Sequence, residues 1–136
     1  LRTSNIILAG INAVSWISSA YDKANSAAQT VPQNAQNSNY TLTLGDAGKY
    51  IYYTQGTSVN LYIPTTSNVA FPNGTSIMIV SKTTSSANIT VTPNSGVSLF
   101  LAGNSTSTTR NVTTYGMATL MHVEANTWFI NGTGIV

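Results

Sequence analysis

The segment LTLGDAGKYIYY (residues 42–53) contains two short runs in which apolar and polar residues alternate, separated by a turn-like group. Alternation with a period of two is typical of a half-buried β-strand. Between the runs, Asp46 can accept hydrogen bonds from nearby backbone amides, and Gly48 can adopt the positive φ that most residues avoid. The segment therefore predicts a strand, a turn and a second strand, with Asp46 and Gly48 as structural turn residues.

Two chemical alternatives exist for the same segment, because it contains Asp46 and Lys49, two of the few charged residues of the protein. They could form an acid and base pair, or the loop could hold a phosphate. A phosphate-binding loop needs more glycines and a helix after it, whereas a strand pattern follows Lys49. The turn is therefore the favoured interpretation.

The period of two continues to the end of the chain. The expected strands are residues 40–44, 49–54, 59–64, 77–81, 88–92, 97–101, 117–124 and 126–131. Turn-forming clusters separate them, and Pro72 and Gly74 are the predicted turn residues of one such cluster. Short strands at this density predict a mainly β fold, with residues 40–136 forming a β-sandwich of the jelly-roll type.

The alternation also predicts which side chains face the core. The expected inward set is Leu42, Leu44, Ile51, Tyr53, Leu61, Ile63, Ile77, Ile79, Ile89, Val91, Leu120, Trp128 and Ile130. Tyr50, Tyr52 and Tyr62 then fall on the opposite face, where tyrosines can pack across strands or enter a subunit interface.

The first 31 residues follow a different period. From Ile7 to Val31 the apolar residues fit a seven-residue frame, with Gly10 the one poor occupant. The predicted core positions are Ile7, Val14, Ile17, Tyr21, Ala24, Ala28 and Val31. Such a frame, with β-branched residues at both core positions, favours a coiled coil of three strands. A single amphipathic helix packed on its own domain would have a similar stripe, and that alternative stays open.

Pro32 is expected to end the helix, since the residue before a proline is disfavoured in the α region. Residues 32–39 are polar and are predicted to form a linker. The predicted organisation is thus a helical coiled-coil stalk over residues 1–31, continuing upstream of Leu1, a linker over 32–39 and a β-sandwich head domain over 40–136.

The low content of charged residues limits the classes of function that the protein can have. Charged residues make up 6% of the 136 positions, against about 25% in an ordinary soluble domain. The three acidic residues, Asp22, Asp46 and Glu124, fall in separate predicted elements, so we predict that the protein is not an enzyme and has no catalytic or cofactor-binding residues.

The basic residues and the apolar runs bear on partners. The five lysines and arginines are spread singly along the chain, whereas a nucleic-acid partner requires a cluster of them. No apolar run approaches the roughly 18 residues of a membrane span. We therefore expect neither a nucleic-acid partner nor membrane insertion.

His122 is the only histidine in the sequence. It is expected on the strand face opposite Leu120, as a surface or interface residue, and only Glu124 shares its predicted face. A metal site needs more ligands than these, so none is predicted within one chain. In a trimer, three copies of His122 could meet on the axis around an ion, and this possibility stays open.

Several motifs recur in a known group of proteins. The order LGDAGKYI (44–51), NLYIP (60–64), VAFPNGTSIMIV (69–80), ITVTPNSGV (89–97) and ATLMHVEANTWFINGTG (118–134) resembles a β-module of tailed-bacteriophage structural proteins. This module occurs in tail fibres and related virion appendages. Upstream, SAYDKANSAAQ (19–29) is similar to helical repeats in fibres of marine and cyanobacterial phages.

The resemblance implies a non-enzymatic, homotrimeric part of a virion, assembled in the cytoplasm of a bacterial host. Its expected partners are other phage virion proteins of the tail or capsid and a glycan of the host surface. A tail fibre that binds a receptor is the first expectation. A capsid-attached head fibre or decoration protein is the alternative, and a polysaccharide-degrading enzyme is a third. The ligand-binding residues and the receptor are not predicted.

Overall fold

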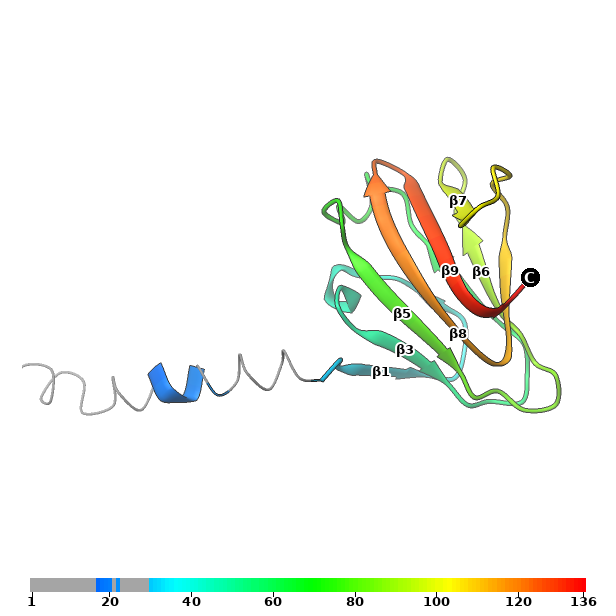
Figure 1. Ribbon diagram of the computed structural model, residues 1–136, viewed down its shortest axis with the longest axis horizontal. Helices are drawn as coiled ribbons and strands as arrows, with labels where there is room; N and C mark the ends of the chain where they lie inside the picture. The colour runs from blue at the N-terminus through cyan, green and yellow to red at the C-terminus, as the bar shows by residue number, and fades with distance from the viewer. Residues whose placement is uncertain (1–16, 21, 23–29) are drawn as a thin grey trace, which may run out of the picture. The chain divides into compact units, whose positions relative to one another are not determined.

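The computed structural model describes residues 17–20, 22 and 30–136 (Figure 1). The chain divides into two units, Leu1–Pro32 and Gln33–Val136. In the first unit, residues 17–20 and 22 are helical and exposed. The second unit is mainly β, with a nearly closed sheet and almost no helix, so the predicted β-rich class is confirmed.

The β-domain contains nine strands in one sheet. The strands are β1 (Gln33–Gln36), β2 (Tyr40–Thr41), β3 (Tyr50–Tyr53), β4 (Val59–Ile63), β5 (Ser76–Ser81), β6 (Ile89–Pro93), β7 (Ser98–Leu101), β8 (Arg110–Glu124) and β9 (Thr127–Ile135). A single 3-10 turn, η1 (Leu44–Asp46), lies between β2 and β3.

Successive strands alternate between two halves of the sheet. In one half β1, β3 and β5 run parallel to one another, and in the other half β2, β4 and β6 do the same. The long strand β8 joins the halves, because residues 117–121 pair with β5 and residues 110–112 pair with β6. β9 pairs with β8 and with β7.

The ends of the sheet come close together because β1 and β2 lie at opposite ends of the strand order. Only residues 37–39 connect them, and so short a connection spans at most about 14 Å. The sheet therefore curls around one hydrophobic core, and the outer faces of β1, β3, β5, β8 and β9 lie side by side in Figure 1.

The predicted jelly-roll topology is wrong, because a jelly roll is built from antiparallel strands. Side chains alternate in the same way in parallel and antiparallel strands, so the sequence pattern could not distinguish them. A sheet with one solvated face is more common in antiparallel proteins, and this favoured the incorrect topology.

The predicted inward side chains are buried with one exception. Leu44 is exposed, because the chain leaves the strand after Thr41 and Leu44 begins η1. The half-buried Tyr50, Tyr52 and Tyr62 alternate with buried residues along β3 and β4. The period of two therefore located the core correctly wherever the strand is regular.

Strand β2 ends earlier than predicted, at Thr41, and β9 ends later, at Ile135. Two other segments differ more. Residues 33–36, predicted as linker, form β1, which pairs in parallel with β3 from Gln33↔Tyr50 to Gln36↔Tyr53. Strand β8 begins at Arg110, seven residues before the predicted start at Met117. Both segments are polar, and backbone pairing with a neighbouring strand, which requires no apolar pattern, holds them in the sheet.

Candidate functional site

Asp46 lies at the end of η1 with only 2% of its surface exposed. Its Oδ2 accepts hydrogen bonds from the backbone N–H of Thr43 at 2.8 Å and from Thr43 Oγ1 at 3.3 Å. The turn ends at Gly48, whose φ of +74° is the left-handed conformation that glycine tolerates best. Asp46 and Gly48 thus occupy the turn between β2 and β3.

The Asp46 carboxylate also binds two other elements. Asn34 Nδ2 of β1 donates to Oδ1 at 2.8 Å, and Tyr40 Oη of β2 donates to Oδ2 at 2.8 Å. A carboxylate has about four acceptor sites, and four donors surround this one. Asp46 therefore joins β1, β2 and η1, and its oxygens are occupied by the protein itself.

Burial near this carboxylate raises the pKa of two tyrosine phenol groups. Burial, together with Tyr40 and Asp46 nearby, raises the pKa of Tyr53 to about 12. Tyr53 Oη donates a hydrogen bond to the Ser38 carbonyl oxygen at 3.2 Å. Burial is also the largest cause of the raised pKa of Tyr40, to which the Asp46 carboxylate contributes.

We expect the stability of the domain to fall at alkaline pH because of Tyr53. The folded-state pKa lies above the ordinary value of 10.0, so the stabilisation is complete below pH 10 and is lost as the pH rises toward 12. The difference between the folded-state pKa of about 12 and the ordinary value of 10.0 corresponds to roughly 2–3 kcal/mol of unfolding free energy. Urea unfolding between pH 9.5 and 11.5 should give a smaller loss for Tyr53→Phe than for the wild type, and equal losses would contradict this origin.

His122 lies in a buried aromatic cluster. Its ring centroid is 5.0 Å from that of Trp128 and 6.4 Å from that of Phe71, and its Nδ1 lies 3.1 Å from the Pro72 carbonyl oxygen. Trp128 and Phe71 meet edge to face, with centroids 5.2 Å apart. The cluster closes the core below the loop that precedes β5.

The expected position of His122 on the face opposite Leu120 is wrong. Residues two apart on a strand share a face, and both side chains are buried, with 2% of the surface of His122 exposed. Three copies of a ring in this position cannot meet at a molecular axis. The idea of an ion held there is therefore contradicted by the burial of the ring.

Pro72 and Gly74 lie in the loop above this cluster. The Pro72 carbonyl oxygen accepts hydrogen bonds from the Thr75 backbone N–H at 3.1 Å and from Thr75 Oγ1 at 2.7 Å. Gly74, with φ of +88°, donates its N–H to the His122 carbonyl oxygen at 2.6 Å. The predicted turn residues thus connect the loop to β8.

Two of the seven predicted coiled-coil core residues fall within the described part of the chain. Ile17, which is helical, is 68% exposed. Val31 is 47% exposed and is not helical, so the helix predicted to end at residue 31 does not extend that far. The remaining five, Ile7, Val14, Tyr21, Ala24 and Ala28, lie outside the described residues.

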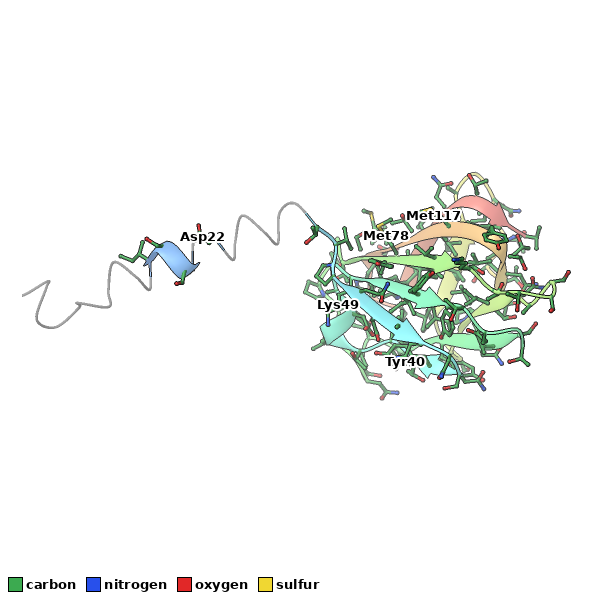
Figure 2. All side chains as sticks on the ribbon, turned by 90° about the horizontal axis from the view of Figure 1, so that it is seen from below. Asp22, Tyr40, Lys49, Met78 and Met117 are labelled. Carbon is green, nitrogen blue, oxygen red and sulfur yellow. The ribbon has the colours of Figure 1, made fainter. Side chains whose placement is uncertain are left out.

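An apolar patch of four side chains lies on the outer face of β8 and β9, interrupted by the polar pair Thr119 and Asn131. The patch is defined by Met117, Met121, Val123 and Phe129, all of which are exposed. Met121 pairs with Phe129 across the strands, and the Phe129 ring lies 5.6 Å from that of Phe100 on β7. Half-buried Met78, on neighbouring β5, lies on the same side of the domain as Met117 (Figure 2). The patch carries no charged side chain.

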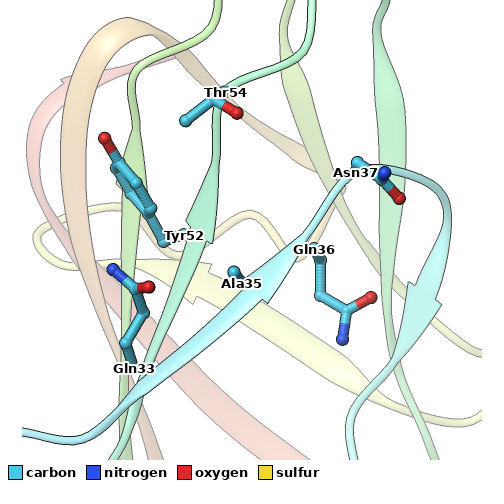
Figure 3. A pocket seen from close by; sticks show the side chains of 6 residues that line it. All are labelled: Gln33, Ala35, Gln36, Asn37, Tyr52 and Thr54. Carbon is cyan, nitrogen blue, oxygen red and sulfur yellow. The ribbon is translucent and has the colours of Figure 1, made fainter.

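A polar notch lies on the outer face between β1 and β3 (Figure 3). Its volume is about 340 Å³, and it is lined by Gln33, Ala35, Gln36, Asn37, Tyr52 and Thr54. The sequence pattern does not predict this notch, because its β1 residues fall in the predicted linker. The apolar patch was not predicted either, although the three consecutive apolar residues Trp128–Ile130 place Phe129 on the outer face.

Three further observations concern the described residues alone. No group of three or more potential metal-ligating side chains occurs among them. No helix within that part of the chain is long and apolar enough to cross a membrane. Arg110 is buried at the start of β8, where its guanidinium Nη2 donates to the Thr106 carbonyl oxygen at 2.8 Å and so holds the loop before β8.

Comparison with known proteins found no match, either to a protein-family model or to a curated protein.

Proposed function

We propose that this chain is a non-enzymatic structural protein of a phage virion. In this proposal residues 1–31 form a coiled coil in a homotrimeric fibre, and the β-domain contacts the surface of the host cell. The motifs quoted for the resemblance supply its starting point. Asp46, Phe71 and Trp128, which belong to those motifs, hold the turn and the aromatic cluster together, as expected for a structural module.

The observation that carries the proposal is the apolar patch on β8 and β9. Exposed, uncharged apolar side chains that lie near one another on a sheet favour contact with another protein surface. Around a threefold axis the patches of three copies would face one another, so no charge would have to be buried. Ile17 and Val31, at predicted core positions of the coiled coil, are likewise exposed in the single chain.

The acidic residues support the non-enzymatic part of the proposal. A glycosidase requires a pair of carboxylates flanking the scissile bond. In the β-domain the acids are Asp46, whose oxygens accept four hydrogen bonds, and the exposed Glu124 at the end of β8. Release of sugar from host envelopes by the purified protein would overturn this part.

Location on the particle tests the function directly. Antibodies raised against the chain, labelled with gold, would be imaged on particles of the phage that encodes it. Label at the tail supports the receptor-binding fibre, and label on the shell supports the capsid-attached alternative. Absence of the chain from purified particles would overturn both.

Replacement of Ile17 by aspartate is expected to dissociate the trimer. A charge at a buried core position of a coiled coil is left without a partner, so the dissociation constant should rise at least tenfold, or about 1.4 kcal/mol. Sedimentation velocity would measure the change. Ser19→Asp, three positions before Asp22 on the outer side of the predicted coil, is the matched control and should leave the trimer intact.

The same experiment separates the two contact surfaces. An unchanged trimer in Ile17→Asp, together with monomers in Met121→Lys, would mean that the apolar patch alone holds the subunits. If Ile17→Asp gives monomers and Met121→Lys does not, the coiled coil holds the subunits together. A wild-type chain that sediments as a monomer would overturn the trimeric part of the proposal.

A further inference from the structure

We propose that the notch between β1 and β3 binds an uncharged saccharide. This inference rests on the proposed function, since it identifies the part of the β-domain that would contact a host glycan. The residues that form the notch lie on two adjacent parallel strands, so the geometry follows from the pairing of the strands.

Ala35 forms the floor of the notch. It pairs directly with Tyr52 across the two strands. Gln33, two residues before it, and Asn37, two residues after it, lie on the same exposed face. A methyl group between longer side chains leaves a depression beside the tyrosine ring (Figure 3). The volume of about 340 Å³ is at the lower end of the range for small-ligand sites, about 300–1,000 Å³. It suits a short part of a longer chain of sugars.

The lining matches the chemistry of an uncharged sugar. Two carboxamides on the exposed face, from Gln33 and Asn37, border the notch, and each can both donate and accept hydrogen bonds, as a sugar hydroxyl does. Gln36, which also lines the notch, points to the other face of β1 and binds Asn34 there. The Tyr52 ring adds an apolar face against which the C–H side of a pyranose can pack. No lysine, arginine, aspartate or glutamate lines the notch, so a charged ligand would lose hydration without gaining a counter-charge.

Contacts within the protein hold the lining in position before a ligand arrives. Gln33 Nε2 donates to Tyr50 Oη at 2.8 Å, which uses one of its two N–H groups. Gln36 Nε2 donates to Asn34 Oδ1 at 2.9 Å, and Asn34 is itself bound to Asp46. The Tyr50 and Tyr52 rings meet edge to face, with centroids 6.3 Å apart. Such preorganisation reduces the entropy lost on binding.

The notch and the apolar patch can be used at the same time. In the strand order β5 separates β3 from β8, so the two surfaces are about 10 Å or more apart at the usual strand spacing. A trimer assembled through the patch would carry three notches. Several weak sites on one particle bind a repetitive surface far more tightly than one site does.

The test uses the full-length protein and an array of neutral and acidic bacterial surface polysaccharides. We expect the wild type to bind neutral members, Tyr52→Ala to lower the apparent affinity at least fivefold, and Ala35→Leu to abolish binding by filling the notch. Tyr62→Ala, which removes a half-buried outer tyrosine from β4 in the other half of the sheet, is the matched control and should bind as the wild type does. Urea unfolding of each variant checks that the domain stays folded.

Three results would overturn the saccharide site: no binding to any member of the array, binding to acidic members alone, or equal binding by the wild type and Ala35→Leu. A parallel assay on intact host cells separates this failure from failure of the proposed function. If the wild type and Ala35→Leu attach to cells equally, the notch is not the saccharide site, but the adhesive role of the protein is unaffected. If the wild type does not attach, the adhesive role itself is overturned.

Discussion

Replacement of Trp128 by alanine is expected to lower the free energy of unfolding by about 3–5 kcal/mol. Only 1% of the Trp128 surface is exposed, and its ring contacts both Phe71 and His122. The substitution removes the largest buried side chain of the domain and leaves a cavity that the surrounding strands cannot close. Urea unfolding, followed by circular dichroism, would measure the change.

Phe129→Ala is the matched control, because the adjacent ring lies on the opposite face of β9 with 41% of its surface exposed. Its expected cost is about 1 kcal/mol, the usual value for an aromatic pair such as Phe129 with Phe100. Both variants must be compared at one protein concentration, since association adds to apparent stability. Equal losses in the two variants would mean that Trp128 is not part of the core.

Replacement of Asp46 by alanine is expected to lower the free energy of unfolding by about 2–4 kcal/mol. The change removes the acceptor for Asn34, Tyr40 and the Thr43 backbone, and leaves these donors partly buried without the carboxylate. Strands β1 and β2 should lose protection from hydrogen exchange first, because the carboxylate joins them to η1. Native-state hydrogen exchange would detect this local loss.

A double-mutant cycle isolates one of these bonds. Tyr40→Phe combined with Asp46→Ala should give a coupling energy of about 1.5–3 kcal/mol, the usual value for a hydrogen bond to a charged group. Glu124→Ala, at the exposed end of β8, is the control carboxylate and should change stability by at most about 0.5 kcal/mol. A stable Asp46→Ala variant would contradict the role of this turn in holding β1 and β2.

The residues that hold the turn and the core are different from those that carry the proposed contacts. Asp46, Phe71 and Trp128 lie in the turn and the core, so their variants test folding. Tyr52, Ala35 and Met121 lie on the outer face, so their variants test binding and assembly with little effect on the core. This separation allows adhesion and stability to be measured independently.

The alternation along residues 40–131 was sufficient to locate most strands and their buried side chains. Ile51 and Tyr53 in β3, or Leu61 and Ile63 in β4, are buried because a strand turns every second side chain to the same face. This is a local property of the backbone. The turn positions of Asp46 and Gly48 likewise follow from local chemistry, whereas the bonds from Asp46 to Asn34 and Tyr40 depend on the tertiary structure.

Long-range pairing decided the remaining features. The parallel stacking of β1, β3 and β5, the use of β8 by both halves of the sheet, and the inclusion of residues 33–36 depend on contacts between segments far apart in the chain. Backbone hydrogen bonds make these contacts, and they are almost independent of side-chain type. The notch beside Ala35 and the apolar patch around Met121 exist only because this pairing sets particular side chains next to one another, which no pattern within a single strand specifies.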